Sequence, residues 1–195
     1  PAPNGPPPAS VVPDQRRKLM SQPLPNRYIP AEFLTTHHYI FGQLKVIQSG
    51  LMGMLSDVNS SYLEMTEASL ALIYKPDKVV NYASQLYMVR SRVVAVALDK
   101  RDYLGLQGVM RGGYQRLYPY SVQITTASYD ISGTLDWYGR MEFMAVMSEG
   151  TNDFLLINDA SLTAPLFPAL HITAPVILVN RTYLESIVVQ PKAEG

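Results

Sequence analysis

The chain has 195 residues, of which 47% are apolar and only 16% are charged. A charged fraction of about 25% is usual for soluble domains, so we expect part of the surface to face other polypeptides. Sixteen basic and sixteen acidic residues give a formal net charge of zero, which argues against a partner with a phosphate backbone. The absence of cysteine excludes disulfides and thiol chemistry, and no apolar run reaches the roughly 18 residues of a membrane span.

The first 30 residues contain nine of the fifteen prolines. This composition favours an extended polyproline-like arm, which is disordered when it is alone in water. We therefore expect residues 1–30 to dock along a neighbouring subunit or partner. The alternative is a tail that folds back on its own domain. The residues that we expect at the docking contact are Pro6, Pro7, Pro8, Arg16 and Arg17.

Two phrases in the sequence resemble each other: "YLEMTEASL" at Tyr62 to Leu70 and "FLLINDASL" at Phe154 to Leu162, which lie 92 positions apart. The same shift gives seven identities over the 27 positions from 50 to 76. Upstream, "YIFGQL" aligns with "DISGTL", and downstream "LDKRDYL" aligns with "LVNRTYL". Because the three matches occur in the same order, they indicate an internal duplication.

Each copy begins with an alternating stretch, "HHYIFGQLKVI" or "SYDISGTLDWY", that predicts a strand. Its glycine, Gly42 or Gly133, predicts a bulge or a close approach of two backbones. The following "GLMGMLSD" and "RMEFMAVMSE" have apolar residues at helical spacing and predict short helices. The repeated phrase is the second strand.

A continuous apolar run follows in each copy, "RVVAVAL" in the first and "PVILVN" in the second. Such a run predicts a strand buried on both faces, and we give the two runs the same place in the two copies. The first copy carries about twelve extra residues before this run, "DKVVNYASQLYM". We interpret them as a longer hairpin.

The predicted fold class is therefore mainly β: two tandem, pseudo-symmetric small β domains, each a barrel or sandwich with a short helix. We expect the Pro-rich arm at residues 1–30, the first domain at 31–105, a linker at 106–120 and the second domain at 121–190. The linker is rich in glycine and tyrosine and leads into the alternating strand "SVQITTAS". Duplicated units of this kind can join their edge strands into a common sheet.

The motifs resemble an uncharacterised bacterial family of small β domains: a strand with glycine, then "LSD.N", an aromatic-led strand and an apolar strand ending "VNR..L..I". The second copy, Tyr129 to Ile187, matches best. Leu55 to Asn59 match the middle motif, whereas "ALDKRDYL" departs from the "VNR" phrase. That family has no assigned chemistry, so the resemblance implies architecture alone.

More distantly, "SGTLD" and "VNRTYLESI" are similar to the two strand signatures of Sm-like barrels. The Arg-Gly that completes the RNA pocket of that family is absent after Arg181, and a helical insert separates the two strands. The resemblance therefore does not imply RNA binding.

No set of side chains matches a catalytic, metal-binding or cofactor-binding signature, and we expect none of these sites. The three histidines, at positions 37, 38 and 171, are too few for a three-ligand zinc site. Tyrosine is abundant, with thirteen residues, and supplies large contact area at a low entropy cost. We therefore expect Tyr114, Tyr118 and Tyr120, in and beside the linker, at a protein contact.

These observations favour a non-catalytic structural or accessory subunit of a larger homo- or hetero-oligomeric assembly, with no nucleic-acid partner and no membrane span. The alternative is a regulatory module that binds a nucleotide or RNA through Arg111, Arg116 and Arg181. In it, "YDISG" follows two arginines as in the cyclic-dinucleotide site that PilZ domains carry, although Gly133 departs from that family's Asp-x-Ser-x-x-Gly spacing. The compartment stays open, and we favour the cytoplasm.

Overall fold

The computed structural model describes residues 27–47, 49–57, 59–105, 116–148 and 153–189. Several residues that the sequence predicts at contacts lie outside this part of the chain: Pro6, Pro7, Pro8, Arg16, Arg17, Arg111 and Tyr114. The elements of the described part are β1 (Arg27–Leu34), β2 (His38–Val46), α2 (Gly50–Ser56), β3 (Tyr62–Leu72), β4 (Lys75–Val89), η1 (Arg90–Arg92), β5 (Ala95–Leu98), η2 (Arg101–Leu104), β6 (Leu117–Thr126), β7 (Asp130–Tyr138), α4 (Phe143–Ser148), β8 (Phe154–Thr163), β9 (His171–Asn180), η3 (Arg181–Tyr183) and β10 (Leu184–Val189).

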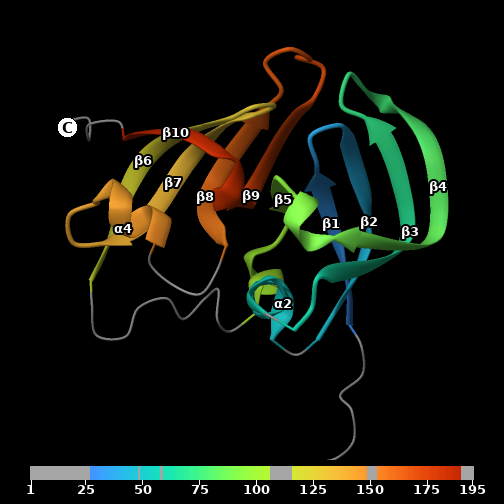
Figure 1. Ribbon diagram of the computed structural model, residues 1–195, viewed down its shortest axis with the longest axis horizontal. Coiled ribbons are helices and arrows are strands. Elements are labelled where there is room, and N and C mark those ends of the chain that lie inside the picture. Colours follow the sequence, from blue (N-terminus) through green and yellow to red (C-terminus); the bar gives the residue numbers. More distant parts are fainter. Residues whose placement is uncertain (1–26, 48, 58, 106–115, 149–152, 190–195) are drawn as a thin grey trace, which may run out of the picture.

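The described strands form one open sheet of ten strands, in the order β10-β6-β7-β8-β9-β5-β1-β2-β3-β4 (Figure 1). All neighbouring strands are antiparallel. The predictions of a mainly β chain and of two short helices at these positions are confirmed. The sheet continues through both predicted domains, because β9 of the second pairs with β5 of the first.

Two predicted boundaries differ from the structure. Strand β1 begins at Arg27, so residues 27–30 belong to the sheet rather than to the Pro-rich arm. Strand β6 begins at Leu117, so the last four residues of the predicted linker are also strand. The sequence did not predict these strand residues because Pro30 and Pro119 lie within them, and proline is rare inside a sheet.

The two apolar runs are buried strands, as predicted, but they hold different places in the sheet. All four residues of β5, the end of "RVVAVAL", are buried, and so are residues 176–180 of β9, in "PVILVN". Strand β9 forms a hairpin with β8, whereas β5 pairs with β1. The predicted match between the runs, and between "LDKRDYL" and "LVNRTYL", is therefore wrong. The twelve extra residues lie within β4, a strand of 15 residues that forms a hairpin with β3.

The buried side chains form two clusters. We call the cluster that includes β1, β2, β3 and α2 the N-terminal core, and the cluster that includes β6, β7 and β8 the C-terminal core. Strand β5 contributes to both, with Val96 and Leu98 in the N-terminal core and Ala95 and Ala97 in the C-terminal core. Successive residues of a strand point to opposite faces, so the two cores lie on opposite faces of the sheet at β5. Strand β9 divides its residues between the cores in the same way.

The two helices differ in how much of their apolar surface is covered. Helix α2 buries Leu51, Met52 and Leu55 in the N-terminal core. The Arg90 guanidinium donates hydrogen bonds to the carbonyls of Leu55, at 3.0 Å, and Asp57, at 2.6 Å, which satisfies acceptors at the end of this helix.

Helix α4 buries only Val146. Its Phe143 and Met144 side chains are 55% and 74% exposed. An apolar face left open in this way requires a reason, because scattered apolar exposure is common but exposure of adjacent large residues is not.

Gly42 and Gly133 lie at bulges with close backbone approach, as the sequence predicts. The pairing of β2 with β3 shifts register beside Gly42, and a Cβ on Gly42 would lie 2.9 Å from the Ala68 Cα. The pairing of β7 with β8 shifts in the same way beside Gly133. The bulged strands place Glu67 and Asp159 at φ 50° and 46°, a left-handed conformation that aspartate tolerates better than glutamate.

We expect Gly42→Ala to lower the free energy of unfolding by about 1–3 kcal/mol, the usual cost of forcing a methyl group into packed structure. Urea denaturation measures this change. Gly139→Ala is the control, because Gly139 has φ +60° but no atom within 4 Å of the added methyl group. Its cost is limited to about 1 kcal/mol of backbone strain. Equal losses in the two variants would contradict the close approach at Gly42.

Candidate protein–protein interface

Strand β4 is the last strand at one end of the sheet, and its outer edge has no partner among the described strands. Residues 79–89 of this strand contain no charged side chain. Exposed edge strands without charge pair readily with other strands, and natural proteins usually protect them with lysine, proline or a covering loop. The large apolar side chains of this stretch that are about half exposed are Val79, Val80, Tyr82, Tyr87 and Val89.

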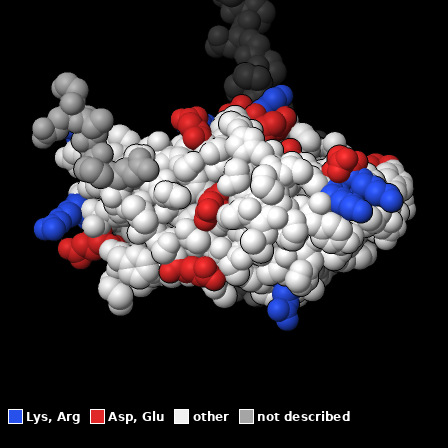
Figure 2. Space-filling view, turned by 90° about the horizontal axis from the view of Figure 1, so that it is seen from above, with Lys and Arg blue, Asp and Glu red and all other residues white. Residues whose placement is uncertain are grey.

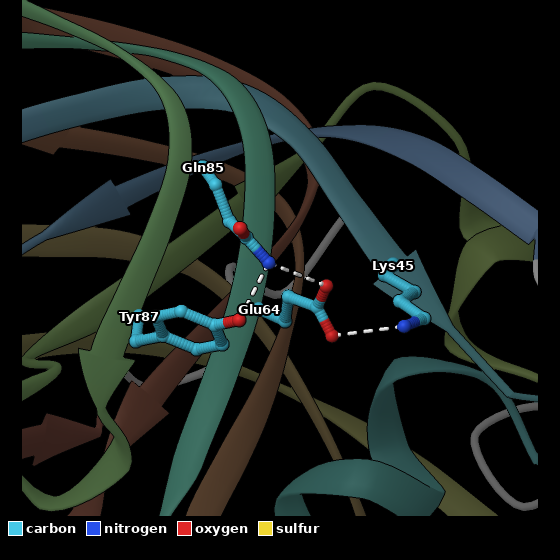
Figure 3. Close-up of polar contacts among 4 residues, drawn as sticks. All are labelled: Lys45, Glu64, Gln85 and Tyr87. Atoms are coloured by element: carbon cyan, nitrogen blue, oxygen red, sulfur yellow. Dashed lines mark hydrogen bonds and ion pairs between the residues drawn. The ribbon is translucent and has the colours of Figure 1, made fainter.

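A polar network crosses the three strands at this end of the sheet (Figure 3). Lys45 of β2 forms an ion pair with Glu64 of β3, with 2.9 Å between Nζ and Oε2. Gln85 of β4 donates from its Nε2 to Glu64 Oε1 at 3.2 Å and also to the Tyr87 hydroxyl. The network therefore ties the side chains of the edge strand to the two strands behind it.

The ion pair changes the protonation of both partners. The hydrogen bond from Lys45 lowers the pKa of Glu64, against an opposing effect of desolvation. The same hydrogen bond raises the pKa of Lys45. The side chains are 29% and 24% exposed, so the pair lies close to solvent and is weakened by screening. Its main effect is to orient the network.

Strand β10 forms the opposite end of the sheet, and one of its edges likewise has no partner among the strands that the structure describes. It has six residues, "LESIVV", with one charge at Glu185. Val188 and Val189 are 53% and 41% exposed. Both ends of the sheet therefore offer apolar strand edges.

The pairing of β5 with β9 shows how two such edges join within this chain. Four residue pairs connect them, from Ala95 with Val179 to Leu98 with Val176. Asn180, which is 3% exposed, extends the contact: its backbone N–H donates to the Val94 carbonyl at 2.9 Å.

The polar groups of Asn180 are satisfied on both sides of this joint. Its Nδ2 donates to the Val93 carbonyl at 2.9 Å, and its Oδ1 accepts from the Thr182 N–H at 3.0 Å. Tyr183 also crosses the joint, since its hydroxyl donates to the Ser91 carbonyl at 2.9 Å. The joint is thus apolar in its centre and saturated with hydrogen bonds at its margin.

Of the tyrosines predicted at a contact, Tyr118 lies on the surface, whereas the Tyr120 side chain makes contacts within the fold. Tyr118 is 42% exposed, and the Arg116 guanidinium carbon lies 5.3 Å from its ring centroid. The Tyr120 hydroxyl donates to the Gly139 carbonyl at 2.6 Å, and its ring packs against the C-terminal core.

The structure does not bring Arg116 and Arg181 together. Arg116 precedes the first residue of β6, whereas Arg181 is three residues before Leu184, which pairs with the last residue of β6, Thr126. A strand of ten residues spans about 30 Å at roughly 3.3 Å per residue, so the two arginines lie at opposite ends of this strand. One compact ligand does not reach both.

The aromatic pair Tyr62 and Tyr87 was not predicted from the sequence. The two rings meet edge to face, with centroids 5.6 Å apart, and the side chains are 51% and 57% exposed. The signal that points to them is the absence of charge over residues 79–89, which is unusual for a solvent-facing hairpin.

Charged side chains lie in small scattered groups on the face shown in Figure 2, separated by wide uncharged surface. In the described ranges, no group of three or more His, Asp or Glu residues could hold a metal ion. Nor is any helix in the described part of the chain long and apolar enough to cross a membrane. Comparison of the chain with protein-family models, curated proteins and solved structures finds no match.

We expect the Glu64 carboxyl group to titrate below its ordinary value of 4.5. Because its pKa is lowered in the folded state, the ion pair stabilises the fold above the unfolded pKa, and this contribution is lost as pH falls through the folded pKa. Carbon-detected NMR titration measures the midpoint. Lys45→Met should return it toward the ordinary value, and an unchanged midpoint in that variant would contradict the assigned cause.

Proposed function

We propose that the protein is a non-catalytic structural subunit of a larger protein assembly and that it contacts its neighbours through the edges of its sheet. The observation that carries this proposal is the β4 edge: 11 consecutive uncharged residues on an end strand, with half-exposed tyrosine and valine side chains. Apolar edges of this kind associate with other strands unless they are protected. The proposed function requires no catalytic group.

We further propose that the chain consists of two copies of one five-stranded unit. The order of the sheet supports this, since it reads β10-β6-β7-β8-β9 followed by β5-β1-β2-β3-β4. A short 3-10 helix links β4 to β5, and another links β9 to β10. The registers agree at a shift of 91: Phe33 pairs with Ile40, and Ile124 pairs with Ile131. The bulges beside Gly42 and Gly133 also coincide at this shift.

In this proposal, the joint between β5 and β9 is a contact between two copies of the unit that are linked in one chain. Within the described part of the chain, it leaves the outer edge of β4 in one copy and of β10 in the other without a partner strand. The surface of the chain is then suited to repeated addition of similar units. The Pro-rich arm, residues 1–30, remains a proposed second contact.

We expect the particle isolated from the cells that make this protein to exceed the 21.7 kDa of one chain. Tyr87→Lys should reduce the particle toward that mass, because loss of a central aromatic side chain and burial of a new charge weaken an interface by about 30-fold or more. Native mass determination measures both. Leu166→Lys is the control, because Leu166 is 80% exposed but lies between β8 and β9, outside both end strands. A wild-type particle of one chain would refute the proposed function.

A further inference from the structure

We propose that β4 of one molecule pairs with β10 of a second copy of the same chain, head to tail, in the register that joins β9 to β5. This inference rests on the proposed function and names its partner. The first step is the place of β4. Leu156 pairs with Leu178 in the β8–β9 hairpin. Glu64 of β3 corresponds to Leu156 of β8, and it pairs with Tyr87 in the β3–β4 hairpin. Tyr87 therefore occupies the position in its unit that Leu178 occupies in the other.

The place of β10 follows from its inner neighbour in the same way. Ile187 of β10 pairs with Ile124 of β6. In the other unit, Val96 of β5 pairs with Phe33 of β1. Phe33 is the residue that corresponds to Ile124 at the shift of 91. Ile187 therefore stands where Val96 stands.

The internal joint now gives the register between two molecules. Leu178 pairs with Val96 in the joint, so we expect Tyr87 of one copy to pair with Ile187 of the next. Both edges are free to form this ladder, because neither end strand has an outer partner among the described strands. The expected pairs are Met88 with Ser186, Tyr87 with Ile187, Leu86 with Val188 and Gln85 with Val189.

Exposure at the β4 end supports a second copy as the occupant. Tyr62 is 51% exposed, whereas its counterpart Phe154 is 1% exposed. Tyr87 is 57% exposed, whereas Leu178 is fully buried. The counterparts are covered because β5 of the other unit lies beside β9 in the sheet, whereas no described strand lies beside the outer edge of β4.

The opposite end shows the same contrast. Val188 of β10 is 53% exposed, whereas its counterpart Ala97 of β5 is 3% exposed. Val189 is 41% exposed, whereas its counterpart Leu98 is 1% exposed. Each end therefore exposes the apolar residues that the other end would cover.

The contact between molecules lacks two features of the internal joint. Val89 stands where Asn180 stands, so the amide hydrogen bonds across the joint have no counterpart. Glu64, paired with Lys45, stands where the apolar Leu156 stands, so an ion pair lies at the margin of the contact. We therefore expect this association to be weaker than the internal joint and to depend on protein concentration.

The contact is heterologous, because β4 and β10 are different surfaces, and it leads to a closed ring or an open chain. The test uses the purified full-length protein and two variants, Tyr87→Lys and Val188→Lys, each of which places a charge on one edge. Sedimentation analysis should show wild-type oligomers of several chains and a single chain of 21.7 kDa for each variant alone. An equal mixture of the variants should form a dimer, because one keeps an intact β10 and the other an intact β4.

Tyr82→Lys is the matched control. Tyr82 lies on β4 and is 57% exposed, as Tyr87 is. Its counterpart Thr173 lies outside the four pairs of the internal joint and is itself exposed. This variant should assemble like the wild type. Circular dichroism and thermal unfolding of all three variants confirm that each is folded.

Several results would overturn the proposal. Oligomers of Val188→Lys alone, with Tyr87→Lys monomeric, would mean that β4 pairs with β4. If the purified wild-type protein is monomeric but the particle from cells is larger, a different protein binds the edge. The proposed function then stands, and the second copy as partner is refuted. A monomer in both preparations would refute both. A monomer that assembles only after removal of residues 1–26 would mean that the chain's own arm fills the edge.

Discussion

The pairing of β5 with β9 is the contact on which the arrangement of the rest of the sheet depends. It consists of only four residue pairs, yet both of its faces are buried in different cores. Each half of the chain uses the other to complete its core: Leu34 and Ile73 lie in the C-terminal core, and Phe154 and Leu156 lie in the N-terminal core. Neither half is therefore expected to bury its apolar surface alone, and the joint is as much a part of each core as the hairpins are.

The two open edges follow from the same constraint. Each end strand leaves one row of backbone N–H and C=O groups without a partner strand in the described chain, and such an edge pairs with other strands unless it is protected. Strand β4 carries charge near its beginning, at Lys75, Asp77 and Lys78, and none beyond residue 78. The protection that edge strands usually carry is thus confined to the hairpin tip, while the part of β4 that matches the joint is left unprotected. This distribution is what an interface requires and what an isolated sheet avoids.

Much of the local structure could be predicted from the sequence, because alternation, helical spacing and the glycines at Gly42 and Gly133 act over a few residues. The order of the strands could not. The runs "RVVAVAL" and "PVILVN" look like copies of each other because both are buried on two faces, and the same burial selects the same small and β-branched residues in each. They are partners instead. Composition indicates burial but does not indicate which strand lies beside which, so the exposed tyrosines could not be distinguished from core tyrosines either.

The internal joint and the proposed contact between molecules differ in strength for a reason that lies in chain connectivity. Within one chain, β5 and β9 are held at a high effective concentration, and Asn180 adds hydrogen bonds across the joint. The proposed contact between molecules has the same strand pairing but no covalent link and no counterpart of Asn180. At its margin, the Lys45–Glu64 ion pair replaces part of the apolar surface. A ladder of only four pairs then forms only when the chain is abundant or when further contacts add to it. In the proposed assembly, the joint within each chain is therefore held by the chain itself, and the joint between chains depends on protein concentration.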